Sequence, residues 1–194
     1  MSPWTIAAVV GGYLLGSIDF GVILPRVRGV DIYASGSGNP GATNVLRTMG
    51  RGAATTVMLG DLGKGIAAAA MGGTAGGDPA AIAAGFAAVL GHCFPVWHRF
   101  RGGKGVAATA GTVLWVEPLV GLILFAVWAA IVAVTKRASL ASIAVAAALV
   151  PGLWVVGQRG WTLAWATLIA VLVVTRHRAN IDRLLRNAEH RIEP

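Results

Sequence analysis

Long apolar runs alternate with short gaps rich in glycine and cations along the whole chain, and this pattern constrains the fold most. The apolar runs predict seven membrane spans, at about residues 4–24, 53–71, 79–97, 105–116, 118–134, 139–156 and 161–175. A membrane helix needs about 20 mostly apolar residues to cross roughly 30 Å of hydrocarbon. Only 12% of the residues are charged, against about 25% in soluble domains. We therefore expect an all-α, polytopic integral membrane protein with one domain over residues 1–194.

The distribution of Lys and Arg predicts the orientation of these spans. If the N-terminus lies outside, the opposite, inner gaps hold fourteen cations: Arg26, Arg28, Arg47, Arg51, Arg99, Arg101, Lys104, Lys136, Arg137, Arg176, Arg178, Arg183, Arg186 and Arg191. The outer gaps hold only Arg159, and Lys64 lies within a span. Because cytoplasmic loops are enriched in Lys and Arg, we expect the N-terminus outside, the C-terminus inside and the polar chemistry on the cytoplasmic face. The net charge of +8 then indicates an anionic leaflet and anionic substrates rather than nucleic acid.

Three regions of this topology allow more than one interpretation. The span at 105–116 is too short to cross alone, and one long kinked helix over 105–134 is the alternative; it would leave the cationic tail outside, so we keep seven spans. The first span lacks a preceding basic segment and a clear cleavage site, which indicates a retained helix rather than a signal peptide. The tail at 175–194 has the spacing of a basic amphipathic helix, which lies on the inner membrane surface or packs on its own protein.

A glycine-rich segment at residues 35–47 carries the first candidate site. Its G-x-G-x-x-G pattern predicts dinucleotide binding only when it follows a strand, and here it follows an apolar span. Glycine amides approach anions closely, and Arg47 offers a planar, permanently charged fork for phosphate. A flexible, solvated loop is the alternative. Neutral donors add to the amides: Ser37, Asn39, Thr43 and Asn44.

Two further segments carry charges at positions where charge is unusual or concentrated. Asp61 and Lys64 lie one helical turn apart inside a span, which marks either a functional site or an internal ion pair that only stabilises the fold. Near the next span, Lys104 follows Gly102-Gly103, and a helix N-terminus beside a lysine is suited to anions. His92 is a candidate proton carrier in the same segment.

The remaining polar residues give little support for covalent or metal chemistry. The single Cys93 is interpreted as a small packing residue, and His98 as an interfacial residue. None of the usual zinc or calcium ligand spacings occurs, so we expect neither a metal nor a cofactor. A transporter or channel for a phosphorylated solute remains an alternative function, because glycine breaks and one-sided cations also suit anion passage. We find no internal repeat relating residues 1–97 to 98–194.

The polar segments together resemble the PlsY family of acyl-phosphate:glycerol-3-phosphate acyltransferases. The matching stretches are GSGNPGATNVLR at 36–47, GDLGKG at 60–65, GHCFPVWHRFRGGKGVA at 91–107, KRASLASI at 136–143 and RHRANIDRLL at 176–185. The resemblance implies transfer of an acyl group from acyl phosphate to the sn-1 hydroxyl of glycerol 3-phosphate, giving lysophosphatidic acid and phosphate. It also implies seven helices in the bacterial inner membrane, with the active face cytoplasmic.

Motif positions assign roles to individual residues by resemblance. They imply catalytic roles for Ser37, Arg47, Lys104 and His92. Substrate-binding roles are implied for Gly38, Asn39, Gly41, Thr43, Asn44, Gly60, Asp61, Lys64, Gly65, Gly102, Gly103, Ser142 and His177. The chain departs from the family pattern at Asp19, where proline is usual, and at Tyr33, where arginine is usual. Because acyl phosphate already carries a good leaving group, alignment of two anionic substrates is the main task, and we expect direct transfer without an acyl-enzyme.

Overall fold

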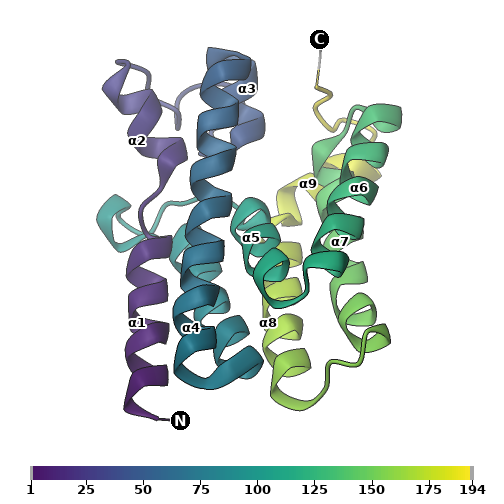
Figure 1. Cartoon of the computed structure of the whole chain (residues 1–194). Helices are drawn as coiled ribbons and strands as arrows, with labels where there is room; N and C mark the ends of the chain where they lie inside the picture. The colour runs from purple at the N-terminus through teal and green to yellow at the C-terminus, as the bar shows by residue number, and fades with distance from the viewer. Residues whose placement is uncertain (1, 193–194) are drawn as a thin grey trace.

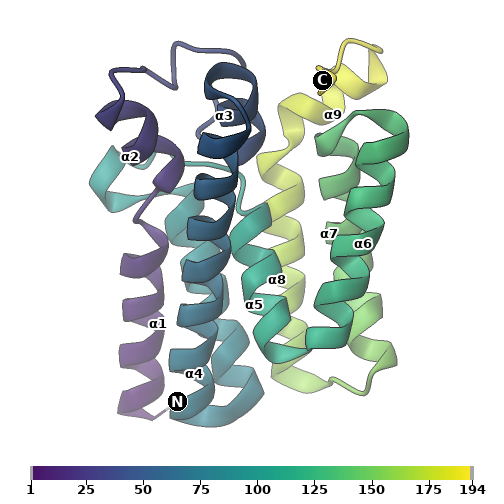
Figure 2. The same cartoon turned by 45° about the horizontal axis from the view of Figure 1, so that its top comes forward.

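The computed structural model describes residues 2–192 as a bundle of α-helices (Figures 1 and 2). The helices are α1 (Pro3–Gly16), α2 (Phe20–Val27), α3 (Ala42–Met49), α4 (Arg51–Cys93), α5 (Val106–Val116), α6 (Pro118–Thr135), α7 (Ala138–Val155), α8 (Gly160–Arg176) and α9 (Arg178–Leu185), with a short 3₁₀ helix η1 (Val96–His98). No β-strand occurs in residues 2–192. The predicted all-α class is therefore confirmed, whereas Met1 and the last two residues of the predicted domain and tail lie outside the described residues.

Helix α4 is a helical hairpin, whose two arms correspond to the predicted spans at 53–71 and 79–97 (Figure 1). The helix breaks at Gly76 and Gly77, and Gly77 has φ of 67°, a left-handed conformation that glycine adopts without strain. A Cβ on Gly72 would lie 2.2 Å from the carbonyl oxygen of Ala80, so the two arms pack backbone to backbone. The first arm runs further into the turn than predicted, because Gly72 and Gly73 remain helical.

Glycines also bring the neighbouring helices against both arms of α4. A Cβ on Gly16 of α1 would lie 2.1 Å from the carbonyl oxygen of Ala88, in the second arm. A Cβ on Gly111 of α5 would lie 2.0 Å from the carbonyl oxygen of Leu62, in the first arm. In lipid, helix association depends on such close packing because the apolar solvent supplies little driving force. The hairpin is therefore the centre on which α1 and α5 are built.

Helices α5 and α6 are separate and reverse direction at Glu117 (Figure 1). Gly121 lies so close to Leu114 that an added Cβ would be 2.8 Å from Leu114 Cδ2. The alternative of one helix over 105–134 is therefore wrong. Helix α5 has 11 residues and rises only about 16 Å, roughly half of the hydrocarbon thickness.

Four helical stretches are long and apolar enough to cross a membrane: Pro3–Val27, Arg51–His98, Pro118–Thr135 and Ala138–Val155. A fifth is present if α8 and α9, which bend by 56°, count as one span. This confirms a multi-pass membrane protein. The count of seven crossings, with the two arms of α4 taken separately and α5 included, stays a prediction.

The described part of the tail packs on its own protein. The backbone N–H of Ile192 donates to the carbonyl oxygen of Lys136 at 2.7 Å, and Ser139 Oγ donates to Glu189 Oε1 at 2.8 Å. The structure thus favours the second of the two interpretations of the tail. The N-terminus of α1 and the described C-terminal segment lie at opposite ends of the bundle (Figures 1 and 2).

Candidate active site

A cavity of about 450 Å³ lies among α3, the first arm of α4, α5, α6, α7 and α8. Its polar part is formed where α3 follows the glycine-rich loop, where α5 and α7 begin and where α8 ends, and it includes Ser37, Thr43, Arg47, Lys104, His177 and Asn180. The rest of its wall is apolar and includes Leu62, Val113, Leu114, Phe125, Leu149 and Ile169. One cavity therefore joins a region of cations and amides to a region suited to hydrocarbon.

Asn44 gives the glycine-rich loop its shape. Asn44 is buried, and its side-chain oxygen accepts a hydrogen bond from Ser37 N–H at 2.8 Å while its Nδ2 donates to the Ser35 carbonyl at 2.9 Å. A Cβ on Gly36 would lie 2.3 Å from Asn44 Oδ1, so only glycine fits there. Asn44 lines the cavity, but both of its amide atoms already hold the loop.

Ser37 and Arg47 present their side chains to this cavity without protein partners. The Arg47 side chain is exposed, and neither it nor the Ser37 hydroxyl makes a hydrogen bond or ion pair within residues 2–192. An arginine without a carboxylate partner keeps its full donor capacity for a ligand. These two residues are therefore available for the roles that the resemblance implies, although nothing in the structure tests those roles.

Lys104 belongs to a chain of hydrogen bonds that ends in the tail. Its Nζ donates to Asn180 Oδ1 at 2.5 Å, and Asn180 Nδ2 donates to Glu189 Oε1 at 2.6 Å. Burial lowers the pKa of Lys104 to about 8, although the Glu189 carboxylate opposes this. Burial thus brings the pKa of Lys104 closer to neutral pH than that of a solvated lysine.

Glu189 completes this network and neutralises part of its charge. It also accepts hydrogen bonds from Ser139 Oγ at 2.8 Å and Arg183 Nε at 2.9 Å. Burial acts to raise the pKa of Glu189, but the hydrogen bonds from Asn180, Ser139 and Arg183 outweigh it and hold the pKa below its usual value. No sequence pattern marked Ser139, Asn180, Arg183 or Glu189 as site residues, although the matching stretches at 136–143 and 176–185 contain the first three.

His177 and Ser142 lie on the cavity wall in different states. His177 Nδ1 is 2.7 Å from the Val173 carbonyl, which can only accept, so Nδ1 carries the proton and Nε2 is left as the acceptor of the neutral ring. The Ser142 hydroxyl donates to the Ala138 carbonyl at 2.8 Å and accepts from Trp128 Nε1 at 3.1 Å. His177 therefore retains a free nitrogen, whereas the hydroxyl proton of Ser142 is already committed to the backbone.

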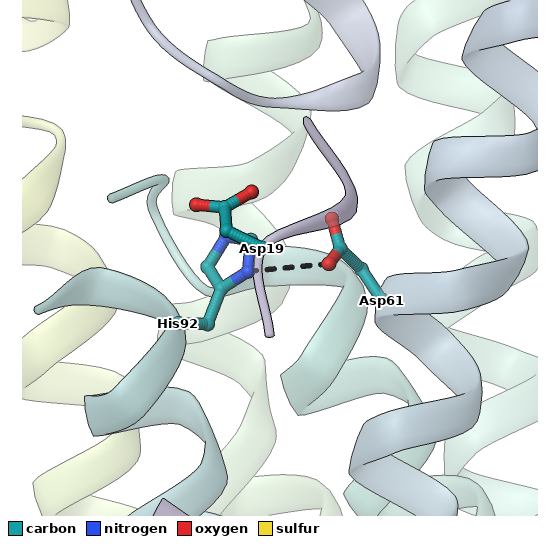
Figure 3. A group of neighbouring side chains, drawn as sticks. All are labelled: Asp19, Asp61 and His92. Atoms are coloured by element: carbon teal, nitrogen blue, oxygen red, sulfur yellow. Dashed lines mark ion pairs between the residues drawn. The ribbon is translucent and has the colours of Figure 1, made fainter. Parts of the chain in front are cut away.

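A buried charge cluster lies where α1, α2 and the two arms of α4 meet (Figure 3). Lys64 Nζ is 2.8 Å from both Asp61 Oδ1 and His92 Nδ1, and it donates to the Ile18 carbonyl at 2.9 Å. One ligand atom each from Asp19, Asp61 and His92 lies within 4.8 Å of the others, as a metal site would require. The Lys64 ammonium, however, already binds two of those three donors. We interpret the cluster as an internal ion pair that stabilises the fold.

Eleven of the seventeen predicted site residues line the cavity: Ser37, Asn39, Gly41, Thr43, Asn44, Arg47, Asp61, His92, Lys104, Ser142 and His177. The other six do not: Gly38, Gly60, Lys64, Gly65, Gly102 and Gly103.

Close packing accounts for several of the glycines outside the cavity wall. A Cβ on Gly60 would lie 2.6 Å from the Phe20 ring, and one on Gly65 would lie 2.1 Å from the Ala108 carbonyl oxygen. Gly38 takes a positive φ of 69° in its turn. Gly102 and Gly103 pack on His92, where added Cβ atoms would lie 2.0 and 2.2 Å from its carbonyl oxygen and Nε2. These glycines therefore allow close packing of the elements that carry the site, and they do not line the cavity themselves.

The sequence matches the family described as glycerol-3-phosphate acyltransferase over residues 6–187. A glycerol-3-phosphate acyltransferase of Hyphomonas neptunium is 44% identical over 98% of this chain and 95% of its own length. One of Rhizobium meliloti is 48% identical over 98% of this chain and 93% of its own length.

Solved structures agree with these relatives. A crystal structure of PlsY, an integral membrane glycerol 3-phosphate acyltransferase, in its glycerol 3-phosphate form superimposes with a TM-score of 0.94 at 40% identity, covering 97% of this chain and 96% of that one. The lysophosphatidic acid form gives 0.91 at 41% identity, covering 96% and 94%. The helical fold, the cavity and these likenesses lead to one conclusion: the chain belongs to the glycerol-3-phosphate acyltransferase family.

Proposed function

We propose that this acyltransferase moves a fatty acyl group from acyl phosphate to the sn-1 hydroxyl of glycerol 3-phosphate, at the cytoplasmic face of a bacterial inner membrane. The products are lysophosphatidic acid and inorganic phosphate. The observation that carries the proposal is the single cavity in which a cationic, amide-rich part continues into an apolar part. Such a cavity fits two phosphate groups at one end and one acyl chain at the other.

The polar part has the groups needed to hold two anions close together. Arg47 offers a bidentate fork, Lys104 a point charge, and the amides of the glycine-rich loop uncharged donors. Without these groups, the two phosphate-bearing substrates would repel each other. We assign Arg47, Lys104, His177 and Asn180 to phosphate binding, because all four line the same part of the cavity.

The apolar part has the depth of an acyl chain. Along α5, the lining extends from Val106 to Leu114, a rise of about 12 Å over eight residue steps, and Ile169, Ala170 and Val173 continue it on α8. One leaflet of the hydrocarbon core is roughly 15 Å deep. Leu59 and Leu122 on the cavity wall are 57% and 59% exposed, so the cavity opens toward the lipid, where a chain can enter sideways.

The reaction needs no covalent intermediate on the protein. The acceptor hydroxyl oxygen attacks the acyl carbon, the bond between that carbon and the phosphate oxygen breaks, and the departing phosphate takes the hydroxyl proton. In this proposal, the Ser37 hydroxyl, which lines the cavity, donates a hydrogen bond to the oxyanion that develops. Cys93 is fully buried in the main apolar core and does not line the cavity, so it is not the nucleophile.

The position of the cations in the cavity supports the inner-membrane orientation. The polar part of the cavity includes Arg47, Lys104 and Arg183, all in segments that the positive-inside rule assigns to the cytoplasm. Glycerol 3-phosphate is a polar, soluble substrate, and it reaches a cytoplasmic face directly. The chain therefore has the arrangement expected of an enzyme that takes one substrate from water and the other from the bilayer.

The test is acyl transfer by the purified protein with no other protein present. Palmitoyl phosphate and glycerol 3-phosphate should give lysophosphatidic acid and phosphate in equal amounts, and palmitoyl-CoA should give little product. Equal turnover of palmitoyl-CoA would contradict the donor assignment. Passage of glycerol 3-phosphate into liposomes, without product, would instead support the transporter alternative.

A further inference from the structure

The loop that carries Lys104 into the cavity is held on two sides by residues far apart in the sequence. On one side, Gly103 N–H donates to the His92 carbonyl at 3.0 Å. On the other side, Arg176 Nη2 donates to the carbonyl oxygens of Gly102 and Gly103 at 2.9 and 3.0 Å, and its Nε donates to Gly103 at 3.2 Å. Both peptide units before Lys104 are therefore fixed.

Arg176 is itself well anchored for this task. It is the last residue of α8, and its guanidinium lies 5.0 Å from the centre of the Phe94 ring. A planar guanidinium can bind two carbonyls and stack on an aromatic ring at once, which a lysine ammonium cannot do. Arg176 does not line the cavity, so its contacts are with the loop rather than with a substrate.

We infer that Arg176 is a positioning residue for acyl transfer, which acts by holding the carbonyl groups of Gly102 and Gly103 so that Lys104 meets the anionic substrate in the correct place. This inference rests on the proposed role of Lys104. Arg176 is one of the fourteen cations of the inner gaps, and the matching stretch at 176–185 gave it no individual role. A misplacement of about 1 Å in a catalytic group can cost on the order of 100-fold in rate.

Arg176 also affects Lys104 through its charge. Burial is the main cause of the low Lys104 pKa of about 8, and the nearby positive charges lower it further. As pH rises through that value, Lys104 loses its charge, so kcat/KM should fall on the alkaline side. Removal of the Arg176 charge should raise the Lys104 pKa and move this fall to higher pH. The charged groups that face Lys104 are Glu189, Arg183, Arg176 and Arg47.

Two substitutions separate position from charge. Arg176→Lys keeps the charge and loses the fork, so KM should rise and kcat/KM should fall by roughly 10- to 100-fold, while the alkaline fall stays at the wild-type pH. Arg176→Gln loses both the charge and the fork. Its kcat/KM should fall by a similar factor, and the alkaline fall should move to higher pH. Arg178→Gln, at an exposed arginine that does not line the cavity, should change neither kcat/KM nor the pH of the alkaline fall. Lys104→Arg should remove the alkaline fall, which identifies Lys104 as its source.

The outcomes distinguish this inference from the proposed function. If both Arg176 variants keep wild-type KM and kcat/KM while Lys104→Ala is inactive, the positioning role is overturned. A loss of kcat alone, at unchanged KM and unchanged pH dependence in Arg176→Gln, would mean a purely structural role and also overturn it. Full activity of Lys104→Ala would refute the role of Lys104 itself. If Arg176→Gln does not fold, KM of Arg176→Lys decides the question.

Discussion

At the scale of single residues, the polar part of the cavity contains two kinds of side chain. The side chains of Arg47 and Ser37 have no protein partner within residues 2–192. The side chains of Asn44 and Ser142, in contrast, already form hydrogen bonds within the protein. A group with free donors can bind substrate without first breaking an internal bond. We therefore expect substitutions of the first kind to affect turnover and those of the second kind to affect folding as well.

Replacement of Arg47 by alanine should remove most activity, because a charge-assisted bidentate bond is lost. A hydrogen bond to a charged group contributes about 1.5–3 kcal/mol, which corresponds to roughly a 10- to 100-fold fall in kcat/KM. Arg47→Lys should recover only part of this, since a point charge lacks the fork. Steady-state kinetics measures the loss, and Arg51→Ala, at an exposed arginine off the cavity wall, is the control. Wild-type kinetics in Arg47→Ala would remove Arg47 from the site.

Ser37→Ala should slow acyl transfer, and the wild-type enzyme should form no acyl-enzyme at Ser37. Loss of one oxyanion donor typically costs about 10²–10³ in kcat, and the effect should appear in kcat more than in KM. Mass spectrometry of the wild-type enzyme after incubation with acyl phosphate alone should show an unmodified chain. An acyl group attached to Ser37 would refute direct transfer.

At the scale of helices, glycine contacts between backbones set the width of the cavity. The α4–α5 contact is the most direct case, because α5 forms one cavity wall and meets the first arm of α4 at Gly65 and Gly111. These contacts leave no room for a Cβ. The close approach of these backbones therefore fixes the distance between α5 and the first arm of α4.

Gly111→Ala should destabilise the protein and reduce activity together. Its Cβ would lie 2.0 Å from the Leu62 carbonyl oxygen, so α5 must move away from α4, and overpacking of this kind costs about 1–3 kcal/mol. The change should be seen as a lower thermal unfolding temperature in detergent and a lower kcat/KM. Gly52→Ala, where an added Cβ meets nothing within 4 Å, should leave both close to wild type. Equal stability of Gly111→Ala would show that the helices are spaced more loosely than described.

Prediction from sequence succeeded best where a single physical constraint dominates. Apolar length predicted the helices because a bilayer admits little else, and the cationic tail favoured separate spans at 105–116 and 118–134 over one long helix. It failed for contacts between distant segments. The bond from Lys104 to Asn180 joins residues 76 positions apart, and no periodicity connects them. The Lys64–His92 contact, across 28 positions, depends on the hairpin at Gly76-Gly77, which two separate apolar runs do not specify.

At the scale of the whole molecule, the architecture predicts two properties: the orientation of the protein in the membrane and the preferred length of the acyl chain. Most of the cations lie in segments at the end of the bundle that holds α2, α3 and α9 (Figure 1), and the cavity extends from Lys104 along α5 and α8. A protein of this shape faces water with its polar part and lipid with its apolar part. Orientation can be measured without knowledge of the chemistry, and the preferred acyl-chain length can be measured from the turnover of different donors.

Single cysteines, introduced in a Cys93→Ala background, should report the orientation. Positions near residues 40, 100, 137 and 185 should react with a membrane-impermeant reagent only after the cytoplasmic side is opened. Positions near 74 and 159 should react from the outside, because the outer gaps carry only Arg159 among the cations. Labelling of the tail from outside would refute the seven-span arrangement.

The acyl-chain preference should depend on small residues in the apolar part of the cavity. Ala110 and Ala170 line it on α5 and α8, and leucine at either position would fill space that a chain needs. Ala110→Leu and Ala170→Leu should shift the preferred acyl phosphate to shorter chains, as measured by kcat/KM for a series of chain lengths. Ala164→Leu, on the exposed face of α8 and off the cavity wall, should not. An unchanged profile in both lining variants would place the acyl chain elsewhere.

The shortness of α5 has a consequence for the product. With 11 residues, α5 covers only about half of the membrane thickness, and the loop at 99–105 that precedes it lies at one end of the cavity. The ester bond is therefore expected to form with the acyl tail still solvated by the hydrocarbon of one leaflet. Lysophosphatidic acid would then leave by lateral diffusion, and turnover would never require a free fatty chain to cross water.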